Sequence, residues 1–317
     1  MINSPTVRLI IIGAGKMGLA HSQAFKKTDG VDIVAITSRT LESAKRLADK
    51  FGVQIFGTEW KLEAIRSKAT AAIIAVPHLL TEQLTSEVLE YGLHILVEKP
   101  VSLNSTTIKA LGSMARKKGV IAMVAMNRRF YSTVIDGILI TKFYGDVLGL
   151  TVIAPDPVSS YRAEAKYDKK VYDEWFKMNT IHIVDLMRLV GGDVTDVKCL
   201  LTKRGRESSR VGLLKFKSGI AGSFTSVNSI GGMNHWELII HGEGVEVRLK
   251  PLERGVVTNS TGSIRILGSS DKDVKKGLLS QANFFIRSII LGKVCYPGSD
   301  FDDHASTLDL AEHLDIG

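Results

Sequence analysis

A glycine-rich hexapeptide near the N-terminus has the residue types and the spacing of a phosphate-binding turn. An apolar run precedes it, a helical pattern follows it, and its sequence is Gly13-Ala14-Gly15-Lys16-Met17-Gly18. In a GxGxxG turn the first glycine permits a tight bend, the second lets the backbone approach a pyrophosphate, and the third allows close helix–strand packing. The helix N-terminus also favours the negative charge of the phosphates. The motif therefore predicts that these residues bind a dinucleotide, rather than forming a glycine turn without a ligand.

The residues that follow the second expected strand indicate which dinucleotide is bound. NAD-binding sites usually carry a carboxylate there, which accepts hydrogen bonds from the ribose 2′-OH. Here the expected strand 33–37 is followed by Ser38, Arg39 and Thr40. Hydroxyl groups and a guanidinium bind a 2′-phosphate through charge-assisted hydrogen bonds, whereas a carboxylate repels it. We therefore expect NADP(H) in preference to NAD; a polar N-cap beside a solvated arginine is the alternative interpretation, and the two are compatible.

Short apolar runs alternate with amphipathic helical patterns over the first 126 residues. The apolar runs lie at 9–12, 33–36, 72–76, 94–97 and 121–124, and the helical patterns begin near residues 17, 41, 82 and 105. Continuous apolar strands separated by helices are typical of a parallel sheet that is covered on both faces. The fold class predicted for residues 1–126 is therefore α/β, a doubly wound Rossmann domain that binds the dinucleotide.

The pattern changes after about Asn127. Residues 175–190 and 278–291 have helical patterns, but strand-like runs with glycine turns lie between them, at 212–216, 220–227 and 238–240. Hairpins of this kind predict an α+β domain, with a largely antiparallel open sheet and helices on one face. We expect this second domain to span residues 127–317.

The composition is that of a globular protein. With 317 residues, 44% of them hydrophobic and 23% charged, the chain is long enough for two domains. We find no secretion signal and no membrane segment at the N-terminus, and therefore expect a cytoplasmic protein. Cys199 and Cys295 belong to no CxxC or ligand cluster, so we expect neither a disulfide framework nor a metal site. The net charge of +8 is spread along the chain, which favours anionic small molecules over a nucleic-acid partner.

Four further segments carry a resemblance to one family. They are Ala75-Val76-Pro77-His78, Val97-Glu98-Lys99-Pro100, Asn127-Arg128-Arg129-Phe130 and Ile181-His182-Ile183-Val184-Asp185. Together with the glycine turn, and in this order, they resemble the glucose-fructose oxidoreductase and inositol dehydrogenase family, Gfo/Idh/MocA, over essentially the whole chain. The resemblance implies an NAD(P)-dependent dehydrogenase or reductase, and it places Pro77, His78 and Glu98 beside the cofactor.

The resemblance also implies two catalytic residues. In the family, the lysine of the Glu-Lys-Pro triplet contacts the substrate oxygen near the nicotinamide, and Lys99 would stabilise negative charge there during hydride transfer. His182 matches the proton donor and acceptor of the family, because imidazole exchanges protons near neutral pH. The alternative interpretations are a surface lysine and a buried structural histidine.

Substrate contacts are expected around this histidine and at the domain boundary. Asn179 and Asp185 each lie one helical turn from the histidine. In the family, residues such as Asn127 and Arg128 line the cleft, and Arg128 or Arg129 either holds an anionic substrate group or forms an inter-domain salt bridge. Four aromatic residues before the histidine either stack on a sugar face or pack against the domain: Tyr161, Tyr167, Tyr172 and Trp175.

One position departs from the family pattern. Family dehydrogenases commonly place an aspartate four residues before this histidine, where the chain has Met178. A methionine neither exchanges a proton nor accepts a strong hydrogen bond. The main hypothesis is hydride transfer to or from an oxygen-bearing carbon of a sugar, cyclitol or nucleotide-linked sugar. Two alternatives stay open: a non-catalytic NADP-binding transcriptional regulator of the same fold, and an imine- or bilin-type reductase. By resemblance, the second domain binds the small-molecule substrate and assembles the chain into a homodimer or homotetramer.

Overall fold

The computed structural model describes residues 6–164, 169–204, 207–227, 232–270 and 274–316. The chain forms two compact units, and each is made of two separate stretches of sequence. The first unit contains Met1–Phe130 and Asp271–Ala305, and the second contains Tyr131–Ser270 and Ser306–Gly317. These units differ from the expected division into residues 1–126 and 127–317, because the chain returns to the first unit after residue 270.

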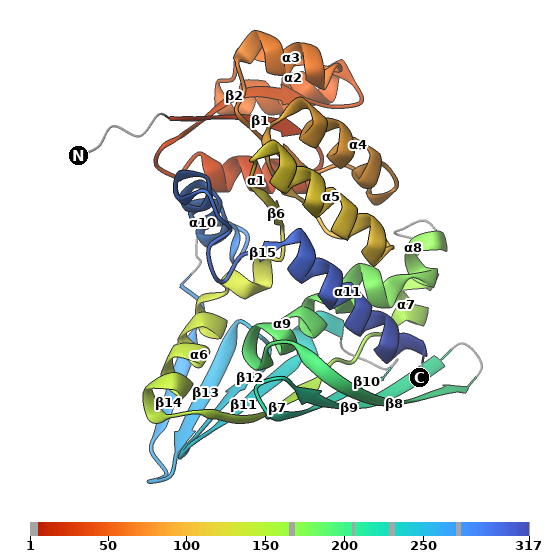
Figure 1. Cartoon of the computed structure of the whole chain (residues 1–317), viewed down its shortest axis with the longest axis vertical. Coiled ribbons are helices and arrows are strands. Elements are labelled where there is room, and N and C mark those ends of the chain that lie inside the picture. Colours follow the sequence, from red (N-terminus) through yellow and green to blue (C-terminus); the bar gives the residue numbers. More distant parts are fainter. Residues whose placement is uncertain (1–5, 165–168, 205–206, 228–231, 271–273, 317) are drawn as a thin grey trace. The chain divides into compact units, whose positions relative to one another are not determined.

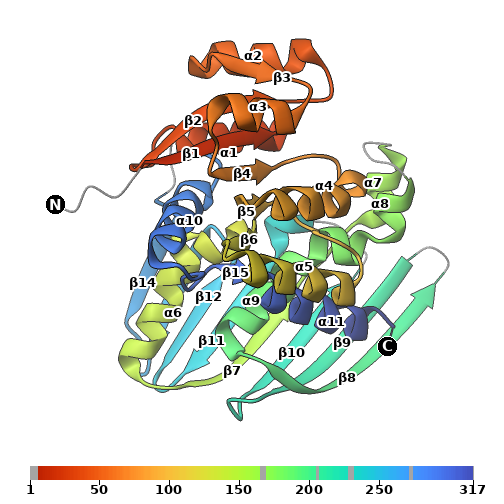
Figure 2. The same cartoon turned by 45° about the horizontal axis from the view of Figure 1, so that its top comes forward.

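The first unit is built on a seven-stranded sheet in the order β15-β6-β5-β4-β1-β2-β3 (Figures 1 and 2). Six strands run parallel: β1 (Val7–Ile12), β2 (Val31–Thr37), β3 (Ile55–Gly57), β4 (Ala71–Ile74), β5 (His94–Val97) and β6 (Ala122–Val124). The short strand β15 (Ser299–Asp300) pairs antiparallel with β6. The order of the six parallel strands is that of a dinucleotide-binding Rossmann domain, in which the direction of winding reverses between β1 and β4. The predicted doubly wound parallel sheet is confirmed.

The helices of the first unit are α1 (Lys16–Phe25), α2 (Leu41–Phe51), α3 (Trp60–Ser67), α4 (His78–Tyr91), α5 (Ser105–Lys118) and α10 (Leu278–Leu291). A 3-10 turn, η1 (Asn127–Phe130), follows β6 in the chain. The late helix α10 lies beside α1, as both views show (Figures 1 and 2). Its apolar stripe, which includes Ala282 and Phe285, joins the same core as Ala24 and Phe25 of α1. The rings of Phe25 and Phe285 meet edge to face at 6.2 Å. Burial of this stripe explains why the chain returns to the first unit.

The second unit is built on an eight-stranded sheet in the order β14-β13-β12-β11-β7-β10-β9-β8, which can be followed in Figure 1. Only β7 and β10 are parallel neighbours among its described strand pairs. The strands are β7 (Val147–Ile153), β8 (Val194–Arg204), β9 (Glu207–Phe216), β10 (Ala221–Val227), β11 (Glu237–Gly242), β12 (Val245–Leu249), β13 (Arg254–Asn259) and β14 (Ile264–Gly268). The predicted largely antiparallel open sheet is confirmed.

Among the described residues of the second unit, helices cover one face of this sheet and leave the other face uncovered (Figures 1 and 2). The helical elements of the second unit are α6 (Ser132–Tyr144), α7 (Val158–Ala163), α8 (Lys169–Asp173), the π-helical turn η2 (Phe176–Thr180), α9 (Ile181–Gly191), the 3-10 turn η3 (Gly232–His235) and the C-terminal end of α11 (Phe301–Ile316). On β9, Leu214 and Phe216 point into the core, whereas Val211 and Leu213 are exposed. This alternation is typical of an antiparallel sheet with one solvent-facing side.

Several element boundaries differ from the sequence prediction. Helix α4 begins at His78 instead of near residue 82, with Pro77 as its N-cap residue. The short strand β3 and the helix α3 were not predicted, because Ile55-Phe56-Gly57 is too short an apolar run to stand out. Within the described part of the chain, no helix is both long enough and apolar enough to cross a lipid bilayer.

Candidate functional site

The glycine turn connects β1 to α1, and its three glycines have different structural requirements. Gly13 has φ of +110°, and a Cβ atom there would overlap the carbonyl of Ala75. A Cβ atom at Gly18 would overlap the carbonyl oxygen of Gly13. At Gly15, by contrast, an added Cβ would meet nothing within 4 Å. The backbone itself therefore requires Gly13 and Gly18, whereas Gly15 borders open space of the kind that a pyrophosphate needs.

The end of β2 carries the residues expected to distinguish the two cofactors. Thr40 is the N-cap of α2, and its hydroxyl oxygen accepts a hydrogen bond from the Ser43 backbone N–H at 3.3 Å. The N-cap interpretation is thus confirmed for Thr40. Ser38 is half-buried, Arg39 is exposed, and neither is a carboxylate. The hydroxyl of Ser38 and the guanidinium of Arg39 are both hydrogen-bond donors, and neither would repel a phosphate group.

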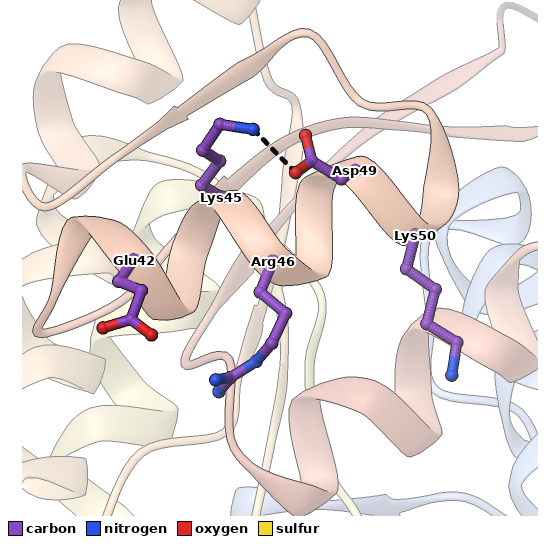
Figure 3. Close-up of a pocket in the computed structure, with 5 residues that line it drawn as sticks. All are labelled: Glu42, Lys45, Arg46, Asp49 and Lys50. Atoms are coloured by element: carbon purple, nitrogen blue, oxygen red, sulfur yellow. Dashed lines mark hydrogen bonds and ion pairs between the residues drawn. The ribbon is translucent and has the colours of Figure 1, made fainter.

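The surface of α2 beyond this end carries alternating charges (Figure 3). Lys45 Nζ lies 2.7 Å from Asp49 Oδ2 one turn further on, while Arg46 and Lys50 extend away from this pair. Such i,i+4 pairs stabilise a helix by only a few tenths of a kcal/mol. This face has the pattern of a solvated helix surface.

At the carboxyl end of β5, Glu98 is held by a histidine from α1. The buried His21 places Nε2 2.7 Å from Glu98 Oε1, and the Glu98 side chain is 15% exposed. Burial alone would raise the pKa of Glu98. The hydrogen bond from His21 and the positive charges of His21, Lys99 and Lys275 outweigh it and hold this pKa below its ordinary value.

Lys99 follows directly, and its amine is the most perturbed lysine of the described residues. Burial lowers its pKa from 10.5 to about 8; attraction to Glu98 opposes this shift, and the positive charges of Arg128 and Lys275 add to it. An amine with this pKa is mainly protonated at neutral pH, and it releases its proton more readily than an ordinary lysine. Such a group can donate a hydrogen bond to a substrate oxygen and exchange a proton with it.

Other predicted residues of the first unit lie at the same sheet edge. Because β1, β4 and β5 are parallel neighbours, their carboxyl ends meet at one edge of the sheet. Pro77 and His78, which start α4 after β4, and Glu98 and Lys99 after β5 therefore share this edge with the glycine turn. The structure brings these predicted residues together.

The residues of η1 are all buried, but their contacts differ. The Asn127 side chain donates to the backbone carbonyl of Lys276 at 2.9 Å. Arg128 lies close enough to Lys99 to lower the pKa of that lysine. Arg129 forms an ion pair with Asp303 at 2.6 Å, inside the first unit. Arg129 is therefore used in packing this unit.

In the second unit, His182 is buried in the first turn of α9, directly after the π-helical turn. Asn179 donates to Oδ1 of the buried Asp156 at 3.5 Å, and the Thr180 hydroxyl donates to Oδ2 of the same carboxylate. Asp156 follows β7, so a carboxylate from another segment lies beside the residues that follow Met178. π-Helical turns inside helices are frequent at functional sites.

Two further predictions concern this unit. Asp185 is buried and accepts a hydrogen bond from the Thr307 hydroxyl at 3.2 Å, which ties α9 to α11. Tyr172 and Trp175 are buried and stack on each other with ring centroids 5.8 Å apart, and Tyr161 contacts Trp175; Tyr167 lies outside the described residues. For these described aromatic residues the contacts support packing within the unit.

Sequence reasoning missed three residues of these sites: His21, Lys275 and Asp156. His21 was the easiest to find, because it stands three residues after Gly18 on the same helix. No group of three or more His, Cys, Asp or Glu side chains suited to a metal ion occurs among the residues for which positions are given.

Known proteins resemble the chain in sequence and in fold. Residues 7–126 match the GFO_IDH_MocA family, described as an oxidoreductase family with an NAD-binding Rossmann fold. The chain is 31% identical to 4-carboxy-2-hydroxymuconate-6-semialdehyde dehydrogenase of Sphingobium sp. over an alignment of 124 residues, and this alignment covers 39% of each protein. It is 25% identical to myo-inositol 2-dehydrogenase of Thermotoga maritima over an alignment of 234 residues, and this alignment covers 68% of this chain and 67% of the relative.

The similarity in fold extends further than the similarity in sequence. A structure of levoglucosan dehydrogenase in complex with NADH and L-sorbose has a TM-score of 0.82 and 18% identity, and it covers 98% of this chain and 96% of that one. The alignment to the Sphingobium relative spans about two fifths of that protein. Residues 7–126 thus belong to the Gfo/Idh/MocA oxidoreductase family with an NAD-binding Rossmann fold, and over nearly the whole chain the fold is that of the levoglucosan dehydrogenase structure.

Proposed function

We propose that this protein is an NADP(H)-dependent dehydrogenase or reductase. It acts on an oxygen-bearing carbon of a sugar, a cyclitol or a nucleotide-linked sugar. The observation that carries the proposal is Lys99, whose readily released proton lies at the same sheet edge as the open space at Gly15. The names of two similar proteins, myo-inositol 2-dehydrogenase and levoglucosan dehydrogenase, support a polyol or sugar as the substrate.

The residues of the first unit fit the cofactor. The turn Gly13–Gly18, with Lys16 and Met17 at the start of α1, would hold the pyrophosphate, and Ser38, Arg39 and Thr40 the 2′-phosphate. Pro77, His78 and Glu98 would line the remainder of the cofactor at the sheet edge. When bound, the nicotinamide supplies or accepts the hydride.

Lys99 would hold the substrate oxygen and move its proton. In the direction of reduction, its protonated Nζ donates a hydrogen bond to the carbonyl oxygen and stabilises the negative charge that develops there. In the direction of oxidation, the neutral amine accepts a proton from the hydroxyl group. The carboxylate of Glu98 places a negative charge next to this amine, which favours its protonated form.

The second unit would add a proton-exchanging group and substrate contacts. His182 is the proposed acid–base residue of this unit, and Asn179 and Asp185 are its proposed substrate-binding neighbours. The carboxylate of Asp156 orients Asn179 and Thr180, which offsets in part the absence of an aspartate at Met178. In the first unit, Asn127 and Arg128 complete the set of proposed substrate contacts.

The test is turnover combined with binding. We expect NADPH oxidation with at least one member of a panel of ketosugars. Lys99→Met and His182→Ala should each lower kcat by roughly two to four orders of magnitude, the usual range for a positioned acid–base group. The matched controls are the exposed Lys117→Met and His313→Ala. NADPH affinity should change little in all four variants.

Three outcomes would contradict parts of this proposal. Near-normal turnover in Lys99→Met or His182→Ala would reduce that residue to a structural role. Tight NADPH binding without turnover on any sugar would favour the non-catalytic regulator, for which Met178 is the supporting residue. Turnover on imines alone would favour the imine-type reductase.

We also propose that the chain assembles with copies of itself through the uncovered face of the eight-stranded sheet. Leu200 of β8 and Leu213 of β9 are 64% and 61% exposed on this face, and Val211, which pairs with Leu200, is exposed between them. Contiguous apolar surface of this kind is typical of an interaction face. A homodimer or homotetramer would bury it.

A further inference from the structure

Lys275 belongs to the segment by which the chain returns to the first unit, just before α10. Two backbone contacts fix this segment. The Asn127 side chain donates to the carbonyl of Lys276 at 2.9 Å, and the carbonyl of Lys275 accepts from the backbone N–H of Leu278 at 3.1 Å. The segment is thereby attached both to the end of the Rossmann sheet, through η1, and to the helix that packs on α1.

The ammonium group of Lys275 lies at the first turn of α1 and has a weak partner there. Its Nζ donates to Sδ of Met17 at 3.0 Å, and a thioether sulfur is a weak acceptor. Although the residue as a whole is exposed, partial burial of its ammonium and the charges of Lys16 and Arg128 lower its pKa, against the attraction of Glu98. This cation is therefore placed where an oxygen anion would stabilise it better than its present neighbour does.

The surroundings of Lys275 have an excess of positive charge. Lys16, Lys99, Arg128 and Lys275 interact electrostatically around the carboxylate of Glu98, which already accepts the hydrogen bond of His21. The N-terminus of α1 adds unpaired backbone N–H groups and the positive end of the helix dipole. Gly15, the N-cap of this helix, borders open space. A ligand with two neighbouring negative charges matches this arrangement.

We propose that Lys275 binds the pyrophosphate of the dinucleotide, opposite the glycine turn, and that Asn127 is the positioning residue that holds the Lys275 segment in place. The inference rests on the proposed function, because it takes a nicotinamide dinucleotide as the ligand. It assigns the last quarter of the chain a direct role in binding the cofactor. It also gives Asn127 a task that does not require contact with the substrate.

The first test is calorimetric titration of Lys275→Ala with three ligands: NADPH, NADH and adenosine 2′-monophosphate. The last has a 2′-phosphate but no pyrophosphate. Loss of one charge-assisted hydrogen bond should lower the affinity for NADPH and for NADH by roughly 10- to 100-fold, and leave the affinity for adenosine 2′-monophosphate unchanged. Lys276→Ala is the matched control, because it keeps the carbonyl that Asn127 holds, and it should bind all three ligands normally.

A double-mutant cycle tests the role of Asn127. Asn127→Leu alone should lower the affinity for both dinucleotides. In a protein that already carries Lys275→Ala it should lower these affinities little further, because the positioning acts through that lysine. Fully additive losses would overturn the positioning role. Lys275→Arg, which retains the charge, should retain most of the affinity.

Other results would overturn the pyrophosphate assignment. Unchanged affinity of Lys275→Ala for both dinucleotides would do so. A loss confined to NADPH and adenosine 2′-monophosphate would also do so, because it would place the ammonium at the 2′-phosphate. Failure of the unmodified protein to bind either dinucleotide would instead overturn the proposed function, and this inference with it.

Discussion

Lys99 meets two requirements that oppose each other in a folded protein. A proton-exchanging amine needs a pKa near neutrality, and burial among like charges provides it, but the same burial makes the ammonium a source of instability. The shift from 10.5 to about 8 corresponds to a cost on the order of 3 kcal/mol when the group is charged. The cofactor-free protein is therefore expected to trade stability for reactivity at this residue.

This trade-off predicts the effect of Lys99→Met on stability. Because the folded pKa lies below the unfolded value, the unfolded chain binds more protons between pH 8 and 10.5, and the stability of the unmodified protein rises with pH over that window. Lys99→Met should therefore be more stable at pH 7, by up to about 3 kcal/mol, and should lose this advantage by about pH 11. Chemical denaturation at both pH values measures the difference.

The matched control for this experiment is Lys117→Met, at an exposed position of α5. It should leave stability unchanged at both pH values. A Lys99→Met protein whose stability differs from that of the unmodified chain by the same amount at pH 7 and pH 11 would show that the Lys99 amine is not perturbed by burial.

Ser38 predicts the preference between cofactors. Ser38→Asp would place a carboxylate where we expect the 2′-phosphate, so NADPH should bind roughly 10- to 100-fold more weakly while NADH binds better. Fluorescence titration with both cofactors measures the reversal. Ser38→Ala is the control, since it removes the hydroxyl without adding charge. If the unmodified protein binds NADH as tightly as NADPH, the interpretation of Ser38 and Arg39 is wrong.

Residues that are close in sequence could be predicted, and residues brought together by the fold could not. The glycine turn and the Ser38–Thr40 segment each carry their chemistry in a few consecutive residues. His21 and Glu98 are 77 positions apart, and Lys275 and Met17 are 258 apart. Likewise Asp156 reaches Thr180 from a separate segment. Only the packed structure reveals these partners, because no local pattern relates them.

At the scale of elements, the β1–α1 turn separates structural from functional glycines. Gly15→Val should abolish dinucleotide binding and leave thermal unfolding almost unchanged, because a side chain there meets open space. Gly18→Ala, the smaller change in volume, should destabilise the protein, since its Cβ would overlap the backbone of Gly13. Calorimetry of binding and of unfolding measures both effects. A folded Gly15→Val protein that retains its affinity would contradict the assignment of the pyrophosphate to this turn.

Helices with a regular apolar pattern over many residues could be predicted from the sequence, whereas local features that depend on tertiary packing could not. The bounds of α10 could be predicted because its apolar residues, among them Leu278, Ala282 and Phe285, recur with helical spacing. The expected helix over 175–190 is instead a π-helical turn followed by α9. The spacing of apolar residues does not reveal a single π-helical turn within a helical segment. Here this turn contains Asn179 and Thr180, whose side chains bind Asp156.

At the scale of the whole molecule, the uncovered sheet face predicts the oligomeric state. The unmodified protein should sediment as a dimer or tetramer, and the pair Leu200→Glu and Leu213→Glu should shift it toward the monomer, because burying two carboxylates in an apolar interface is costly. Leu139→Glu, at an exposed position of α6, is the control. A monomeric unmodified protein, or a double variant of unchanged size, would locate the interface elsewhere or remove it.

The predicted fold class holds for both units, but their composition from two stretches each was not predictable. The boundary near residue 126 rests on a local change of pattern, and the first unit indeed has its first boundary nearby, at Phe130. Nothing in the pattern of residues 278–291 says which sheet the helix will cover. That choice depends on the match between its stripe and the exposed side of α1, which is a property of the packed surfaces.

The return of the chain has a consequence for inheritance. A gene fragment that ends at codon 130 encodes the strands and the glycine turn, but not α10, so the apolar side of α1 would be left without its cover. A single crossover between related genes therefore cannot transplant this nucleotide-binding module intact. Two distant stretches of coding sequence, 1–130 and 271–305, have to be inherited together. Exchange of the interior stretch, 131–270, would keep the Rossmann unit whole, but the incoming sheet would have to pack against the retained residues Leu310, Ala311 and Leu314 of the second-unit core.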